Sequence, residues 1–193
     1  MLRRLYDKTM EFSTHKNALW ILAAIAFVES SVFPVPPDVL LIPMVLAARN
    51  NAWKYATICT LASVMGGLLG YYIGAALYEG IGKPIIDFYH LNEEFSLFTL
   101  KYEEWGIWIV LVSAITFLPF KLATIASGVA DLDLFNFILT STGGRAIRFF
   151  MVAALLYLFG PPIRNLVEKN LGLMFVIFSV LLVGGVLLIK WIT

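Results

Sequence analysis

Long apolar stretches, separated by short polar segments, set the pattern of this chain. Residues 55–78 carry no charged side chain, and residues 171–189 are equally uninterrupted and are followed by Lys190 and Trp191. A helix needs about 20 residues to cross a hydrocarbon core of roughly 30 Å. Lys and Trp are common anchors at the membrane interface. The pattern therefore predicts a crossing helix at 55–78 and a C-terminal transmembrane helix at 170–191.

A third stretch has the length of a crossing helix but contains two cations. Residues 134–159 include Arg145 and Arg148, which lie three positions apart and hence on one helix face. A charged side chain at membrane depth is expensive unless it faces protein or water. We predict a crossing helix at 134–159 whose arginines point toward protein or a water-filled cavity.

Prolines break the stretch at 18–48, which is too long for one crossing and too short for two. Pro34, Pro36 and Pro37 lie inside it. Proline lacks a backbone N–H and pushes the preceding residue out of the helical region, so the helix should end there and restart at Pro36 or Pro37. Each arm alone is shorter than a bilayer core, and unwound backbone at that depth must face protein or water. The pattern favours a re-entrant hairpin.

The same pattern recurs at 105–130, where Pro119 separates two short apolar arms. Each broken pair precedes a crossing helix, so hairpin plus helix forms a unit whose odd number of crossings inverts the second copy. We predict an all-α integral membrane protein: an inverted repeat of re-entrant, proline-broken hairpin plus transmembrane helix, with a C-terminal transmembrane helix. Two kinked, full crossings in place of the hairpins remain the alternative.

Two polar segments flank parts of this membrane domain, which covers residues 18–160. Residues 1–17 are charged and predict an N-terminal interfacial segment, and residues 79–104, rich in acids, predict an extramembrane amphipathic segment. If both hairpins return to their own side, most Lys and Arg residues lie on the side of the N-terminus. The positive-inside bias then predicts a multi-pass protein of the cell inner (plasma) membrane with its N-terminus in the cytoplasm.

Composition supports the membrane class and excludes others. The chain is 60% hydrophobic and 14% charged, with a mean hydropathy of +0.85, far more apolar than a soluble domain. A net charge of +1 argues against bulk attraction to nucleic acid. Two histidines and one cysteine leave a His-based metal site or a Ser-His-Asp hydrolase without its parts. We predict no catalytic residues, no metal and no cofactor.

Two carboxylates in the first hairpin are candidate site residues. Glu29 lies in an otherwise apolar arm, so its charged form must be desolvated unless it is paired. It is a candidate proton carrier, or a structural group bonded to hairpin amides or paired with Lys121. Asp38 opens the second arm, where a carboxylate either complements the positive end of the helix or contributes to the site.

Three cations are the complementary candidates. Lys121 lies two residues after Pro119, at the start of a short arm, so its ammonium and free backbone amides favour an anion such as a phosphate headgroup, unless it snorkels to the interface. The guanidinium groups of Arg145 and Arg148 match phosphate oxygens in a two-pronged way. Their structural alternative is an interhelical ion pair with Glu29, Asp38 or Asp131.

Glycines in the first crossing helix have a structural interpretation. Gly66, Gly70 and Gly74 repeat at the small-xxx-small spacing that lets helices approach closely. We expect them to pack against a hairpin.

Four segments carry a resemblance: Glu29 with FPVPPD (33–38), MGGLLGYYIG (65–74), TFLPFKLATIASG (116–128) and GGRAIRFF (143–150). Together they resemble the DedA family, also called the SNARE-associated Golgi protein or VTT-domain family, in its YqaA-like branch. The resemblance covers roughly residues 18–160. It implies a small inner-membrane protein with two re-entrant hairpins that moves phospholipids or polyprenyl-phosphate carriers, with proton coupling. Thr116 and Leu122 stand where many bacterial members have arginine, and Lys121 precedes the second of these places.

The predicted function is a flippase-like or scramblase-like transporter that moves a phosphate-bearing lipid, such as a phospholipid or polyprenyl phosphate. Protons are the predicted coupling partner, and membrane lipids with phosphate headgroups are the predicted ligands. The alternative is a non-transporting scaffold that assists membrane-protein or envelope assembly. The sequence leaves open the lipid, the choice between proton, sodium and passive movement, and the choice between monomer and homodimer.

Overall fold

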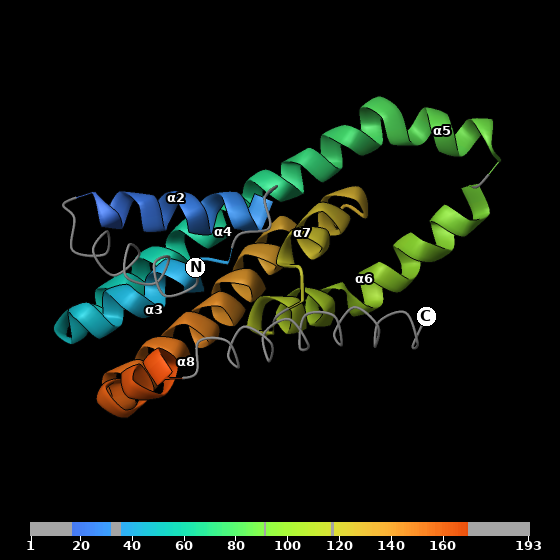
Figure 1. The fold of residues 1–193 in the computed structure, drawn as a ribbon. Helices are drawn as coiled ribbons and strands as arrows, with labels where there is room; N and C mark the ends of the chain where they lie inside the picture. Colours follow the sequence, from blue (N-terminus) through green and yellow to red (C-terminus); the bar gives the residue numbers. More distant parts are fainter. Residues whose placement is uncertain (1–16, 32–35, 91, 117, 170–193) are drawn as a thin grey trace.

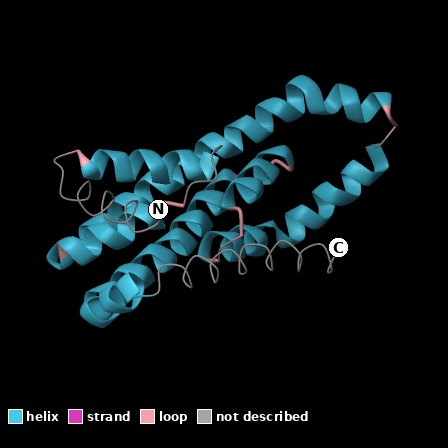
Figure 2. Ribbon diagram, in the orientation of Figure 1, coloured by secondary structure: helices cyan, strands magenta, loops and turns pink. Residues whose placement is uncertain are grey.

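The computed structural model describes residues 17–31, 36–90, 92–116 and 118–169, and these residues form helices and turns with no strand (Figures 1 and 2). The N-terminal segment predicted at 1–17 falls almost wholly outside the described residues. So do Pro34 and the C-terminal helix predicted at 170–191.

The helices of the described chain carry the labels of Figure 1. They are α2 (Ala18–Ser31), α3 (Asp38–Ala47), the short turn η1 (Arg49–Asn51), α4 (Ala52–Leu77), the π-helical turn η2 (Tyr78–Gly82), α5 (Lys83–Phe88), α6 (Asn92–Ile115), α7 (Phe120–Val129) and α8 (Leu134–Lys169).

Both helix breaks lie at the prolines, as the sequence predicts. α2 ends at Ser31, and α3 begins at Asp38 directly after Pro37. α7 begins directly after Pro119, whose backbone is extended (φ −65°, ψ 94°). With 14, 10 and 10 residues, α2, α3 and α7 are roughly 21, 15 and 15 Å long, each shorter than a hydrocarbon core.

The start of the second hairpin arm predicted at residue 105 lies inside a helix. α6 is one continuous helix of 24 residues that begins at Asn92 and passes through Trp105. The preceding residues continue α4 through η2 and α5 as far as Phe88, and the chain turns at His90, which has a φ of 55°. The predicted extramembrane segment at 79–104 is therefore divided between the ends of two long helical rods. Charged side chains do not end a helix, because they can extend into solvent while the backbone hydrogen bonds continue.

The helix predicted at 134–159 also runs further, to Lys169, with a kink at Phe159 (φ −113°, ψ 18°). The carbonyl of Tyr157 would normally accept from the N–H four residues on, but that residue is Pro161, which has none. Arg49 supplies the missing donor: its Nη2 donates to the Tyr157 carbonyl, and its guanidinium lies 5.7 Å from the centre of the Tyr157 ring. The side chain of Arg49 thus caps the helix at its kink.

Two helical segments are long and apolar enough to cross a membrane, judged by length and composition within the described chain. They are Arg49–Phe88 and Leu134–Gly160. The shorter apolar helices are α2, α3 and α7.

The main helices pack in an exchanged pattern around α4 and α8, which contact each other (Figure 1). Of the first arms, α2 packs on α4 and α6 packs on α8. The second arms cross over, so that α3 packs on α8 and α7 packs on α4. The second arm of each proline-broken pair therefore packs on the long helix of the other half of the chain.

Glycines allow the closest of these contacts. A side chain at Gly66 in α4 would overlap the backbone of Phe27 in α2, and one at Gly74 would overlap the backbone of Ile125 in α7. In the second half, Gly144 in α8 faces Ala114 in α6. The small-xxx-small spacing thus packs against both proline-broken pairs, as predicted.

Candidate functional site

Arg145 and Glu29 form a buried ion pair between α8 and α2. Arg145 is 0% exposed, and its Nη2 lies 2.7 Å from Glu29 Oε2. The side chain of Glu29 is 16% exposed. The pair joins residues 116 positions apart, and it links the first arm of the first broken pair to the second long helix.

Arg148, one turn further along α8, forms the second pair. Its Nη2 lies 2.6 Å from Asp38 Oδ2, and its Nη1 donates to the carbonyl of Thr116 at 2.7 Å. Asp38 opens α3 just after the first proline break, and Thr116 follows α6 at the second break. The guanidinium of Arg148 therefore connects the two proline breaks between helices.

Ser30 connects the first ion pair to α4. Its hydroxyl oxygen accepts from Arg145 Nη2 at 3.1 Å, lies 3.1 Å from Glu29 Oε2, and lies 2.6 Å from the hydroxyl of Ser63. Sequence reasoning did not single out Ser30 or Ser63 as polar partners of the pair. The available signal was the adjacency of Ser30 to the single carboxylate of an apolar arm.

Arg145 has donors that its protein partners do not use. Its Nε and Nη1 are buried without a hydrogen-bond partner among the described residues. The ring centre of Phe120 lies 4.2 Å from the guanidinium carbon, and that of Phe149 lies 5.6 Å away, so aromatic rings flank the cation. An arginine carries five N–H donors in a planar fork, a geometry that suits phosphate oxygens.

Lys121 lies in the first turn of α7, beside this cluster. Its backbone carbonyl accepts from the Thr124 hydroxyl at 2.9 Å, and that hydroxyl also lies 3.3 Å from the carbonyl of Ser30. The beginning of α7 thus lies against the end of α2. The ion pair found for Glu29 is with Arg145, in place of the pairing with Lys121 considered from the sequence.

The other sequence candidates fall at the edges of the cluster. Pro37 precedes α3 and Pro119 precedes α7, so both lie beside the cluster, and Pro36 lies next to Pro37. Asp131, considered as an arginine partner, is exposed in the turn before α8 and has a φ of 54°.

Metal ligands do not gather anywhere in the described part of the chain: no three His, Cys, Asp or Glu side chains there are close enough to hold an ion.

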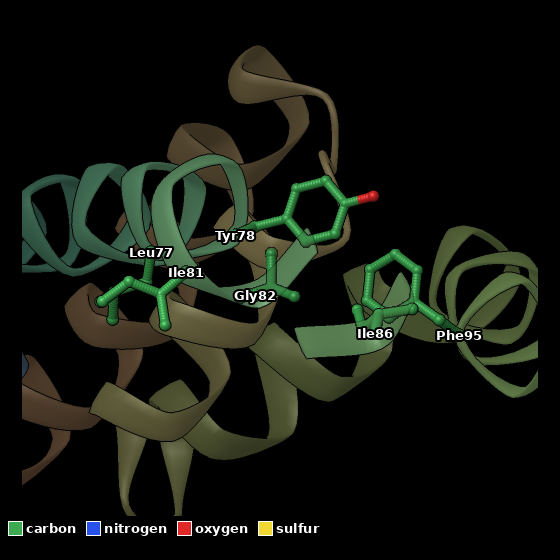
Figure 3. A pocket seen from close by; sticks show the side chains of 7 residues that line it. Leu77, Tyr78, Ile81, Gly82, Ile86 and Phe95 are labelled. Atoms are coloured by element: carbon green, nitrogen blue, oxygen red, sulfur yellow. The ribbon is translucent and has the colours of Figure 1, made fainter. Parts of the chain in front are cut away.

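An apolar pocket of about 220 Å³ lies away from the cluster, at the π-helical turn η2 (Figure 3). Its lining includes Leu77, Ile81 and Ile86, and the ring of Tyr78 stacks on Phe95 at 4.8 Å between centres. None of the charged candidates lines it, so the candidate site remains the two buried ion pairs.

Comparison with known proteins adds a family. The chain is 36% identical over 151 residues to an uncharacterized protein of Haemophilus influenzae, covering 78% of each chain. It is 35% identical over 152 residues to an uncharacterized protein of Histophilus somni, again with 78% of each chain covered. The chain belongs to the family of these two proteins. No family model and no solved structure matches it.

Proposed function

We propose that the chain is a DedA-type membrane protein built from two inverted units of re-entrant hairpin plus transmembrane helix. The proline-broken arms α2, α3 and α7 are each too short to cross a bilayer core alone. The exchanged packing of return arms on α4 and α8 is what a two-fold axis in the membrane plane would produce. Large apolar side chains such as Trp20, Leu122 and Leu139 are 62–78% exposed, which suits contact with lipid.

We place the protein in the inner membrane with several crossings and its N-terminus in the cytoplasm. This orientation rests on the excess of Lys and Arg on the side of the N-terminus. Chemical labelling of a single cysteine introduced at residue 90, in a Cys59→Ser background, tests it, because His90 lies in the exposed turn between α5 and α6. An impermeant reagent added outside should label that cysteine in intact spheroplasts.

The function we propose is movement of a phosphate-bearing lipid across that membrane, coupled to protons. The observation that carries it is Arg145, a fully buried guanidinium. Its Nη2 donates to Glu29 and to Ser30, while its Nε and Nη1 have no hydrogen-bond partner among the described residues. Proton uptake by Glu29 would remove the charge that holds Arg145. The released guanidinium would then bind a phosphate headgroup, and loss of the proton would return Arg145 to Glu29 and release the headgroup.

Lipid movement in reconstituted vesicles tests this function. The vesicles carry either a headgroup-labelled phosphatidylethanolamine or a polyprenyl phosphate, and the exposure of the headgroup is followed with and without a pH gradient. We expect Glu29→Gln, Lys121→Ala and Arg145→Gln to slow transport of at least one of these lipids by about tenfold or more, as loss of a charge-assisted contact of about 1.5–3 kcal/mol implies. Glu103→Gln changes an exposed acid on α6 and is the matched control. Equal rates in wild type and the three site variants contradict the proposal.

A non-transporting scaffold is the second candidate. The observation in its favour is that both arginines already pair with carboxylates, so the pairs would serve only to join the two halves of the fold. For a scaffold, the same substitutions lower the melting temperature in detergent, while protein-free and protein-containing vesicles move lipid at the same rate.

A further inference from the structure

The hydroxyl of Ser30 is buried among several polar atoms in the interior of the described chain. Ser30 is 0% exposed, and four polar atoms lie within hydrogen-bond distance of its oxygen. They are the Ala26 carbonyl at 3.0 Å, Glu29 Oε2 at 3.1 Å, Ser63 Oγ at 2.6 Å and Arg145 Nη2 at 3.1 Å. These atoms come from α2, α4 and α8, so three helices meet at this oxygen.

Counting donors shows how the hydroxyl is used. A serine hydroxyl donates one proton and accepts two. The guanidinium of Arg145 can only donate, which fills the first acceptor position of Ser30. Ser63 is also buried, and Ser30 is the one hydrogen-bond partner of its hydroxyl among the described residues. We therefore assign the Ser63 hydroxyl as the donor, which fills the second acceptor position of Ser30. The single proton of Ser30 is then left with two acceptors, the carboxylate of Glu29 and the carbonyl of Ala26.

We propose that Ser30, held in place by Ser63, is a positioning residue that links proton uptake by Glu29 to release of Arg145. An ionised carboxylate is the stronger acceptor, so it draws the Ser30 proton and the Arg145 N–H together. When Glu29 takes a proton from water, its oxygens become weaker acceptors, and the Ser30 hydroxyl turns to the Ala26 carbonyl. Glu29 thereby loses two donors in one step. The inference rests on the proposed function, because it concerns the same Glu29.

Other charged and titratable groups lie near Ser30 and Glu29. Asp38 on α3, Cys59 on α4, and Arg145 and Arg148 on α8 interact electrostatically with one another. Lys121 on α7 is joined to Ser30 through the Thr124 hydroxyl, which contacts the backbone carbonyls of both. The contribution of Ser30 to the protonation of Glu29 must therefore be separated from the contributions of these charges. A substitution that removes only the hydroxyl does so, because it leaves every charge in place.

Infrared titration of the Glu29 carboxyl tests the inference without any transport assay. The full chain is placed in lipid nanodiscs, and the band of the protonated carboxyl, assigned by its loss in Glu29→Gln, is followed against pH. We expect Ser30→Ala to move the midpoint upward by about one pH unit, because the ionised form loses a charge-assisted hydrogen bond. Ser63→Ala should move it in the same direction by less, since it only weakens the polarisation of Ser30.

Ser31→Ala is the matched control. Ser31 is buried on the same helix, but its hydroxyl bonds to the carbonyls of Phe27 and Val28 in its own helix. Its midpoint should equal that of the wild type. Equal midpoints for Ser30→Ala and Ser31→Ala, or no titrating Glu29 band over the pH range in which the fold is intact, overturn the inference. A shifted midpoint in a protein that moves no lipid supports the linkage and contradicts the proposed function, so the two failures are distinct.

Discussion

Replacing the buried ion pair one partner at a time should produce an asymmetric loss of stability. Glu29→Leu leaves the guanidinium of Arg145, which is 0% exposed, without a counter-charge, and we expect a cost of about 3–5 kcal/mol. Arg145→Leu leaves a carboxylate that is 16% exposed, retains Ser30 and can take up a proton, so we expect a smaller cost of about 1–3 kcal/mol.

The double variant completes a double-mutant cycle with the two single variants. With both charges replaced by leucine, neither ion of this pair remains without its partner, and apolar replacement of a buried pair is often close to neutral. We expect Glu29→Leu with Arg145→Leu to be more stable than Glu29→Leu alone, and a coupling energy of at least about 2 kcal/mol. The free energy of unfolding is measured in mixed micelles by titration with a denaturing detergent, using tryptophan fluorescence.

Additive single costs would refute this reasoning, and so would a larger loss for Arg145→Leu than for Glu29→Leu. The second ion pair supplies an internal comparison. The side chain of Arg148 is 9% exposed, against 0% for Arg145, and after Asp38→Leu it keeps a hydrogen bond to a backbone carbonyl, that of Thr116. The single loss should therefore be smaller than that of Glu29→Leu.

Substitutions at Arg49, Gly66 and Gly143 test the packing. Arg49→Ala removes the donor to the Tyr157 carbonyl and should cost about 1–2 kcal/mol, with partial recovery in Arg49→Lys; an unchanged melting temperature in detergent would contradict the cap. Gly66→Ala forces a methyl group against the backbone of Phe27 and should cost about 1–3 kcal/mol. At Gly143 an added methyl group would meet no described atom within 4 Å beyond its chain neighbours and its own helical backbone, so Gly143→Ala should instead stabilise the helix by roughly 0.5–1 kcal/mol. Equal melting temperatures for Gly66→Ala and Gly143→Ala would exclude the close approach at Gly66.

The helix breaks could be predicted because proline acts locally. Pro37 and Pro119 each precede the first residue of a helix, as their missing N–H and fixed φ dictate. The arm predicted to start at Trp105 rests on a different signal, a change in side-chain polarity, which does not mark the beginning of a helix. A change from charged to apolar side chains alters what surrounds a helix and leaves its backbone hydrogen bonds intact, so α6 continues through it.

The partners at the site could not be predicted, because they depend on how distant segments pack. From the sequence, Arg145 and Arg148 had three equivalent acidic partners, Glu29, Asp38 and Asp131. The exchanged packing decides among them: α2 and α3 both reach α8, while Asp131 stays exposed in a turn. Distances of 110 and 116 positions along the chain leave no local pattern that would reveal such pairs.

The nature of these pairs bears on the choice between transporter and scaffold. If the ion pairs only held α2 and α3 against α8, leucine and phenylalanine at those positions would do so at similar stability and without desolvating four charges. Arg148 could serve stability by bridging the two breaks, since it also satisfies the carbonyl of Thr116. Arg145 bridges no second break, and it keeps buried donors that the described protein atoms do not use. A guanidinium in that state suits a site where an anion and a carboxylate alternate as partners, which favours the transporter over the scaffold.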